Sequence, residues 1–214
     1  MHYPALLLLN AVANSFAGSC NEVKFLIEVT DMIYISKGIV LEHSTEELLF
    51  VRRCGTDFQL TGTEAALWLN GRTGFSEAIA SAAANHLYRM GLIDWEDEDT
   101  PLSHYQILTR CILCPTDTIE LLPLRWQQAH FMVWLREAGL RLTVAELVYL
   151  TERRISPSAK LLGIENRQKL VSLIYTENNI RDNILENQME KSCCRDFVVE
   201  SLLTLLKRKR LVLV

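Results

Sequence analysis

Residues 60–95 read LTGTEAALWLNGRTGFSEAIASAAANHLYRMGLIDW and carry the clearest signals for the fold of this chain. Thr61, followed three residues later by Glu64, has the spacing of a capping box, which predicts that a helix begins here. NGRTG at 70–74 predicts the end of that helix, because Asn and Gly tolerate positive φ angles. A short helix that ends in a turn is therefore expected.

A second helix is predicted over 76–90, with Gly91 as its C-terminal cap. LIDW at 92–95 predicts a strand, and after the acidic loop at 96–99 a further strand is predicted over 105–113. The resulting order is helix, turn, helix and hairpin.

Upstream of this stretch, runs rich in Ile, Val, Leu and Phe predict strands over 33–41, 47–53 and 58–60. Polar turns separate these runs, so a small antiparallel meander is expected before the helices. Nearer the start of the sequence, the apolar run at 4–17 predicts a buried helix and EVKFLIEVT at 22–30 predicts a strand.

The two halves of the 214-residue chain carry opposite charge. Residues 1–120 hold 7 Lys and Arg against 16 Asp and Glu, a balance of −9. Residues 121–214 hold 15 against 10, a balance of +5, and together the halves give the −4 of the whole chain. A chain of this length fits one large domain or two small ones, so we expect an acidic domain over 1–120 and a basic one over 121–214.

The second half opens with a helix predicted over 125–138, whose aromatic residues Trp126, Phe131 and Trp134 are expected to fill core. Gly139 is expected to end it.

The second half also repeats features of the first. LTVAE at 142–146 has the Leu-Thr-x-x-Glu pattern of LTGTE at 60–64, and LLKRKRLVLV at 205–214 resembles LYRMGLIDW at 87–95. At 205–214 and at 87–95, a helix is predicted to lead directly into a strand. Two related units are therefore expected, the second lengthened by residues around 157–192.

This order of elements resembles that of winged-helix proteins over about two thirds of the chain. The fold class expected is α+β and mostly helical, with two winged-helix-like units, the first preceded by the β-meander. Winged helices bind DNA, bind protein or dimerise, so the resemblance alone does not choose among these functions.

Residues 37–79 also resemble the PqqD-like peptide-binding domains, the recognition elements of ribosomal-peptide biosynthesis. The segments that carry this resemblance are GIVL at 38–41, LLFV at 48–51, FQL at 58–60 and ALWLNG at 66–71. The resemblance implies that a meander with an exposed edge accepts an extended peptide as an added strand.

The basic second half predicts contacts with the phosphates of double-stranded DNA. Asn166, Arg167 and Gln168 are also side chains of the types that reach base edges. Two simpler interpretations stay open: cations at a helix C-terminus offset the helix dipole, and an exposed run of charges is often only solvated. The candidate nucleic-acid-binding residues are Arg153, Arg154, Lys160, Arg167, Lys169, Lys207, Arg208, Lys209 and Arg210.

The first half is expected to contact protein instead. Its would-be recognition helix, SEAIASAAANH at 76–86, is small, apolar and uncharged apart from Glu77, and EDED at 96–99 lies in the adjacent wing. Neither suits a phosphate backbone. An alanine-rich face permits close approach of another helix, so a homodimer or an interdomain contact is expected here, together with a protein or peptide partner.

Cys111-x-x-Cys114 suggests a zinc or redox site, but residues three apart in a strand point to opposite faces, and no second pair has zinc-site spacing. Buried thiols are therefore preferred. The sequence contains no Gly-rich phosphate loop, no GxSxG and no HExxH. We expect neither an enzyme nor a protein that needs a cofactor or a metal.

The N-terminal apolar run has no preceding Lys or Arg and is too short to cross a bilayer, and the 6 cysteines are scattered. A cytoplasmic protein without membrane contact is expected. The predicted function is that of a DNA-binding, transcription-regulator-like protein with a protein-interaction first half. The alternative is a PqqD-like peptide- or protein-binding adaptor without nucleic-acid activity.

Overall fold

The computed structural model describes residues 31–45, 48–116, 124–138, 143–154, 172 and 190–214. Within these residues the fold is α+β, with six α-helices and three small antiparallel sheets. The helix predicted over 4–17 and the strand predicted over 22–30 lie outside them. No helix in the described part of the chain has the length and apolar character needed to cross a membrane.

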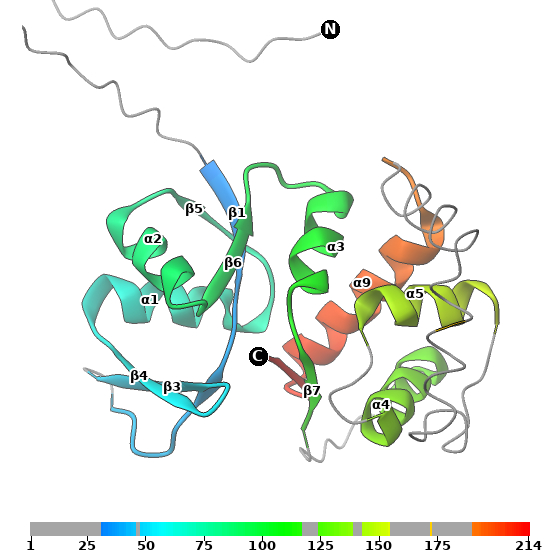
Figure 1. The fold of residues 1–214 in the computed structure, drawn as a ribbon, viewed down its shortest axis with the longest axis horizontal. Helices are drawn as coiled ribbons and strands as arrows, with labels where there is room; N and C mark the ends of the chain where they lie inside the picture. Colours follow the sequence, from blue (N-terminus) through cyan, green and yellow to red (C-terminus); the bar gives the residue numbers. More distant parts are fainter. Residues whose placement is uncertain (1–30, 46–47, 117–123, 139–142, 155–171, 173–189) are drawn as a thin grey trace, which may run out of the picture.

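A three-stranded antiparallel sheet runs through the middle of the molecule (Figure 1). Its central strand is β1 (Asp31–Ser36), which pairs with β5 (Ser76–Ile79) on one edge and with β6 (Ile93–Glu96) on the other. In Figure 1 this sheet stands between helices on its left and helices on its right.

The central strand β1 is buried on both faces. Successive side chains of a strand point to opposite faces, so Met32 and Tyr34 enter one hydrophobic core while Ile33 and Ile35 enter another. This double burial explains the unbroken apolar sequence MIYI, where a strand with one wet face would alternate. The two cores therefore share β1 as a common wall.

The predicted meander forms a second sheet, but the strand predicted over 33–41 is divided, because residues 33–36 belong to β1 of the first sheet and only residues 39–40 enter the meander. β2 (Ile39–Val40), β3 (Leu49–Arg53) and β4 (Thr56–Leu60) pair in sequence order, and both pairs are antiparallel. The hairpin between β3 and β4 turns at Cys54 and Gly55, whose φ angles are 49° and 83°. Positive φ at both positions is typical of a type I′ turn, whose twist matches that of the strands.

Helix α1 (Gly62–Asn70) begins after Thr61, as predicted, but without a capping box. The Thr61 side chain makes no capping hydrogen bond. The Glu64 carboxylate instead lies 2.6 Å from Nδ1 of His86 in the next helix. The spacing therefore marks the start of the helix correctly, although its side chains are used differently.

The helix predicted over 76–90 is wrong in its first part. Residues 76–79 form the edge strand β5, and helix α2 (Ala82–Arg89) begins only after Ser81, whose hydroxyl accepts a hydrogen bond from the Ala84 amide. Pairing with β1 outweighs the helix propensity of this alanine-rich segment. The long second helix expected after the first turn is therefore absent from these described residues.

The strand predicted over 105–113 is also wrong, because most of it is helical. The Thr100 hydroxyl accepts an amide hydrogen bond from the first turn of α3 (Pro101–Thr109), and the proline occupies the start of that helix. Thr-Pro after the acidic loop is thus a helix-start signal. Only the end of the segment is extended, as β7 (Leu113–Pro115).

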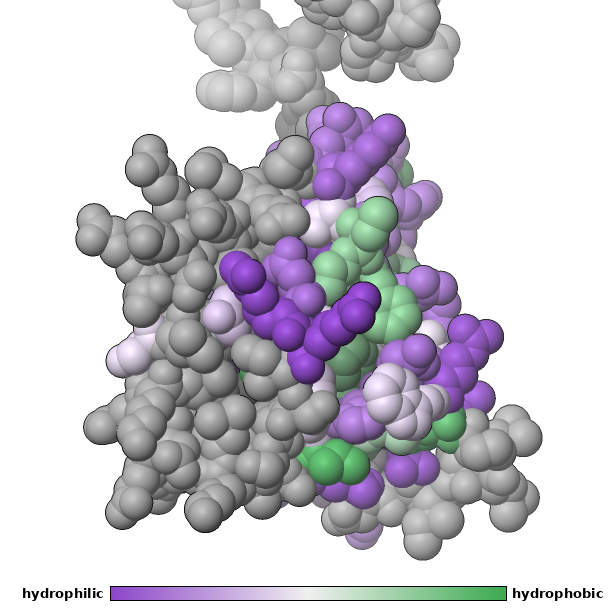
Figure 2. Space-filling model, turned by 90° about the vertical axis from the view of Figure 1, so that its right-hand side faces the viewer, coloured by the Kyte–Doolittle hydropathy of each residue, from purple (hydrophilic) through white to green (hydrophobic). Residues whose placement is uncertain are grey.

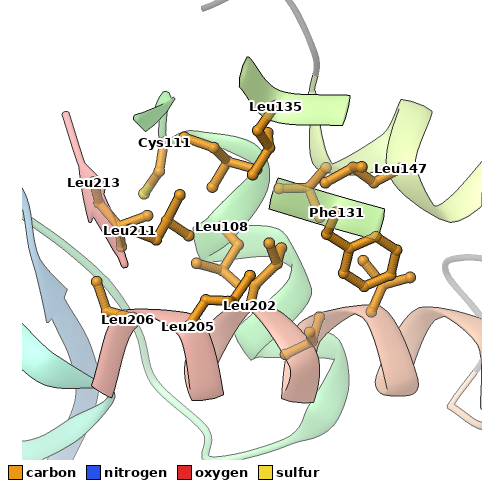
Figure 3. Packing of buried hydrophobic residues seen from close by; sticks show 14 of the residues in the cluster. Leu108, Cys111, Phe131, Leu135, Leu147, Leu202, Leu205, Leu206, Leu211 and Leu213 are labelled. Carbon is orange, nitrogen blue, oxygen red and sulfur yellow. The ribbon is translucent and has the colours of Figure 1, made fainter. Parts of the chain in front are cut away.

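The larger core lies among α3, β7, α4 (Trp126–Ala138), α5 (Val144–Glu152), α9 (Cys193–Lys207) and β8 (Leu211–Leu213). Leucines from several of these elements and the Phe131 ring converge there (Figure 3). Phe131 and Trp134 are buried as predicted, whereas Trp126 is 72% exposed and does not fill core.

The last strand, β8, pairs antiparallel with β7, from Leu113 opposite Leu213 to Pro115 opposite Leu211. This ladder joins residues on the two sides of the predicted boundary after residue 120. The division into domains over 1–120 and 121–214 stays a prediction.

The α2–β6 corner shows how a helix leads into a strand in this fold. Gly91, with φ of 71°, donates its amide to the Tyr88 carbonyl oxygen, and Leu92 donates to that of Leu87, each at 2.8 Å. These two bonds form a Schellman motif, which satisfies carbonyl groups at the end of the helix and reverses the chain. The motif requires a residue in the left-handed conformation at the turn, and glycine adopts this conformation without strain.

Candidate nucleic-acid interface

The α9–β8 corner carries four of the predicted phosphate-binding residues and repeats the Schellman motif. The Lys209 amide donates to the Leu206 carbonyl oxygen, and the Arg210 amide to that of Leu205, each at 2.9 Å. Lys209 has φ of 55° and takes the position that Gly91 takes at the other corner. A side chain in this left-handed conformation costs about 1 kcal/mol.

A segment after β7 holds this corner in place. The Thr116 amide donates to the Arg210 carbonyl oxygen at 2.9 Å, and the Thr116 hydroxyl donates to that of Lys209 at 2.6 Å. Arg136 of α4 donates from Nη2 to the Thr116 carbonyl oxygen at 3.1 Å. These bonds bring Arg136, which the sequence analysis did not select, to the cations of residues 207–210.

Arg72 is a second cation that the sequence analysis missed. It belongs to the 3-10 turn η1 (Gly71–Thr73), which packs against α9, and it lines a small crevice together with Lys209. The Arg72 guanidinium carbon lies 5.9 Å from the centroid of the Trp68 ring, which attracts a cation to its face. Arg72 reaches this corner because η1 packs on α9, and the local sequence of η1 does not indicate that long-range contact.

The Lys207 side chain also lies beside this part of the chain, because a Cβ atom added to Gly74 would be 3.4 Å from Lys207 Cε. One corner thus gathers cations from η1, α4, α9 and the turn before β8. We call this set the basic corner: Arg72, Arg136, Lys207, Arg208, Lys209 and Arg210.

Most members of the basic corner have no carboxylate partner. Within the described part of the chain, Arg72, Arg136, Lys207, Lys209 and Arg210 form no ion pair. Their positive charge is therefore not neutralised by these residues, and it leaves a local field that attracts anions. Elsewhere in the described residues, ion pairs of Lys and Arg join Lys37 and Arg110 to Asp94, Arg110 to Glu96, Arg52 to Asp57, and Arg195 to Asp196.

The remaining predicted residues do not join the basic corner. Arg153 and Arg154 follow α5, where Arg153 lies 5.8 Å from the centroid of the Tyr149 ring and Arg154 lines a cavity with Phe197 of α9. Along α9, Phe197 and Lys207 are about 15 Å apart at ~1.5 Å per residue. The structure thus separates two groups of the predicted cations. Lys160, Arg167 and Lys169 lie outside the described residues.

The α2–β6 corner has the opposite charge, and its carboxylates are used within the fold. Asp94 of β6 pairs with the Lys37 ammonium, and these two side chains are only 7% and 5% exposed. Arg110, which follows the last residue of α3, lies 3.2 Å from Asp94 and 2.7 Å from Glu96. Trp68 Nε1 donates to the Lys37 carbonyl oxygen at 2.9 Å. This network joins β1, β6, α1 and α3, so its charges serve structure.

The two cysteines considered for zinc lie in different surroundings. Cys111 is 8% exposed, and burial raises the pKa of its thiol to about 12. Cys114 is half-buried, and burial, followed by the charge of the Cys54 thiolate, raises its pKa. A cysteine binds a metal ion as the thiolate, and thiols with raised pKa values are rarely ionised at neutral pH. No group of three or more His, Cys, Asp or Glu side chains is placed to hold a metal ion in the ranges that the structure describes.

No known protein-family model, curated protein or solved structure matches this chain. Function is therefore inferred from the basic corner itself.

Proposed function

We propose that this protein binds double-stranded DNA through the basic corner and acts as a transcription-regulator-like protein. The observation that carries the proposal is the gathering of Arg72, Arg136 and the run 207–210 at one place, with five of these cations lacking a carboxylate partner among the described residues. Duplex DNA presents one negative charge per about 1.7 Å of its axis. Several cations held by different elements can contact neighbouring phosphates of this backbone. Such phosphate contacts position a protein on DNA without reading the base sequence.

The conformation of Lys209 supports a role beyond helix capping. Any cation in the last turn of α9 offsets the helix dipole, but the left-handed position is one that glycine occupies more favourably. Gly91 occupies it at the α2–β6 corner, whereas here the chain carries a lysine with φ of 55°. Strained backbone conformations of this kind are concentrated at functional sites. Contact between the Lys209 side chain and DNA would explain why a lysine occupies this position.

We further propose that α9 and β8 are the helix and the wing strand of a winged-helix-like unit. In support of this proposal, β8 follows α9 directly through the basic corner and pairs antiparallel with β7. The cations then lie at the root of the wing, where winged-helix proteins approach the DNA backbone.

The test is fluorescence anisotropy of a labelled random-sequence duplex titrated with the full chain over a series of salt concentrations. Affinity is expected to fall linearly with salt on logarithmic axes, with a slope of about −0.9 per neutralised phosphate. The Lys207→Ala/Lys209→Ala variant should reduce the magnitude of this slope by about 2. The matched control, Arg52→Ala/Arg89→Ala, removes the same charge from exposed positions of the first half and should leave the slope unchanged.

Two results would overturn the proposal. One is the absence of binding at low salt. The other is an equal loss of slope in the corner variant and in the control, because the corner would then contribute only net charge.

A second function, the binding of a peptide strand by the first half, is favoured by the edge of β4. Among the described residues β4 pairs with β3 alone. In a two-residue hairpin the residues that flank the turn exchange both hydrogen bonds, so the backbone groups of Asp57 and Gln59 point away from β3. They are free to pair with an added strand.

Peptides selected on the full chain from a random display library test this second function. Gln59→Pro removes one outward amide of β4 and should weaken the selected peptides while leaving the β3–β4 ladder in place. Lys207→Ala/Lys209→Ala should not affect them. Selected peptides that ignore Gln59→Pro would show that β4 is not the binding edge.

A further inference from the structure

A cavity of about 300 Å³ lies between α4, α5 and the first turns of α9. Trp126, His130 and Trp134 of α4 line it. They are spaced four residues apart, which places them along one face of the helix. Across the cavity lie Arg154, just after α5, and Phe197 of α9. In volume and aromatic lining the cavity is typical of a small-molecule site, where a few polar groups orient a mostly apolar ligand.

The aromatic rings of α4 are ordered against one another. The Trp126 and His130 ring centroids are 4.3 Å apart with an interplanar angle of 66°, and those of His130 and Trp134 are 6.0 Å apart at 71°. In this edge-to-face arrangement the rings hold one another in place. Trp126 is 72% exposed, so its ring is accessible from solvent. The cavity thus offers a fixed aromatic wall with an accessible tryptophan.

Arg154 gives the cavity its charge. It adopts φ of 53°, and its amide donates to the Thr151 carbonyl oxygen at 3.1 Å, so the backbone at the end of α5 fixes its position. Within the described residues Arg154 forms no ion pair, and no carboxylate lines the cavity. A guanidinium group matches the two oxygens of a carboxylate, and pairs with it more strongly than with a neutral acceptor.

The described residues on this side of the molecule are of mixed polarity at the surface (Figure 2). Figure 2 shows the side of the molecule on which α4 and α5 lie in Figure 1, and hydrophobic residues there adjoin strongly hydrophilic ones.

We propose that this cavity binds a planar aromatic carboxylate of one or two rings. The ring lies against the wall formed by Trp126, His130 and Trp134, and the carboxylate accepts hydrogen bonds from the Arg154 guanidinium group. Arg154 then serves the ligand, whereas the sequence analysis assigned it to DNA. The inference is independent of DNA binding by the basic corner, because it depends on a different end of α9.

Isothermal titration calorimetry of the full chain with 2-naphthoate tests the proposal. Saturable binding of one ligand per chain is expected, with a dissociation constant below about 1 mM. The neutral analogue 2-naphthalenemethanol and the non-aromatic anion cyclohexanecarboxylate should each bind at least about tenfold more weakly, because each lacks one of the two recognised features.

Two neighbouring arginines provide a matched pair of variants. Arg154→Gln should weaken 2-naphthoate about ten- to a hundredfold and leave 2-naphthalenemethanol unchanged, since only the charge-assisted bond is lost. Arg153→Gln removes the same charge one residue away, where the side chain lies over Tyr149, and should change neither ligand. Trp126→Ala should weaken both ligands. Thermal melting of each variant shows whether it remains folded, and Arg154→Lys replaces Arg154→Gln if that variant does not.

The proposal is overturned if 2-naphthoate shows no saturable binding up to about 1 mM. Equal effects of Arg153→Gln and Arg154→Gln would also overturn it, as would binding that is indifferent to Trp126→Ala.

Discussion

The two corners at which a helix turns into a strand share a backbone and differ in the use of charge. Gly91 and Lys209 hold the same left-handed position in the same hydrogen-bonded motif. After the first corner, Asp94 forms ion pairs with Lys37 and Arg110. At the second, Lys207, Lys209 and Arg210 have no carboxylate partner among the described residues. The motif itself therefore serves the fold, and the charges around it decide whether a corner is neutralised internally or left for a ligand.

The largest effect expected is on stability at the α2–β6 corner. Asp94→Ala should lower the free energy of unfolding by about 3–5 kcal/mol, because it leaves the buried Lys37 ammonium without its partner. Lys207→Ala at the exposed second corner should change it by less than about 0.5 kcal/mol. Urea unfolding followed by circular dichroism measures both variants.

A double variant separates the two possible causes of the stability lost in Asp94→Ala, an unpaired buried charge and a loss of packing. Replacing both buried partners, as in Lys37→Met/Asp94→Leu, should recover much of the stability, because no unpaired charge is left. If the double variant is as unstable as Asp94→Ala, the ion pair is not what the corner depends on.

A smaller effect is expected from the Cys111 thiol, which lies near the charges of the α2–β6 corner. Burial raises its pKa in the folded state to about 12 from the ordinary thiol value of 9.0. Below pH 9 the thiol is protonated in both states, and above it the unfolded chain loses the proton first. The stabilising contribution is therefore lost as the pH rises from 9 toward 12, at up to about 1.4 kcal/mol per pH unit.

Unfolding measured between pH 8 and pH 10 for the wild type and for Cys111→Ala isolates this contribution. Stability of the wild type should fall more steeply with pH, and parallel curves would show that the thiol ionises equally in both states. No corresponding difference is expected for Lys209→Ala, which lies at the other corner.

Exchange of the two left-handed residues gives the next effect. Gly91→Ala should lower stability by about 1–2 kcal/mol, because φ of 71° is strained for any side chain and the added Cβ would approach Arg53. Lys209→Gly should raise stability by up to about 1 kcal/mol, because it relieves the same strain. The same variant should bind duplex DNA more weakly. A Lys209→Gly protein that is both more stable and equally active in DNA binding would remove the functional reason for the lysine.

Local signals in the sequence predict much of this fold. Thr143 and Glu146 form a complete capping box, with the Thr143 amide donating to Glu146 Oε2 at 2.8 Å and the Glu146 amide donating to Thr143 Oγ1 at 3.2 Å. The same spacing at Thr61 and Glu64 marks the start of a helix without forming the box. The β3–β4 hairpin, the helix predicted over 125–138 and the final helix-to-strand corner also follow from short-range patterns.

What the sequence could not predict depends on contacts between distant segments. The strand at 76–79 exists because the edge of β1 binds it, and no local feature of its sequence, SEAI, indicates that partner. The basic corner shows the same limitation. Residues 207–210 stand out as a run, but Arg72 and Arg136 join them only through the packing of η1 on α9 and the Arg136 bond to Thr116.

Arg136→Gln is the most direct test of the basic corner as a single DNA-binding surface, through the salt dependence of duplex DNA binding measured by fluorescence anisotropy. The side chain lies far from residues 207–210 in the sequence, and only the structure brings it to the basic corner. The slope of affinity against salt should fall in magnitude by about 1, as for Lys207→Ala. A variant that keeps the full wild-type slope, while Lys207→Ala loses it, would contradict the basic corner as a single DNA-binding surface.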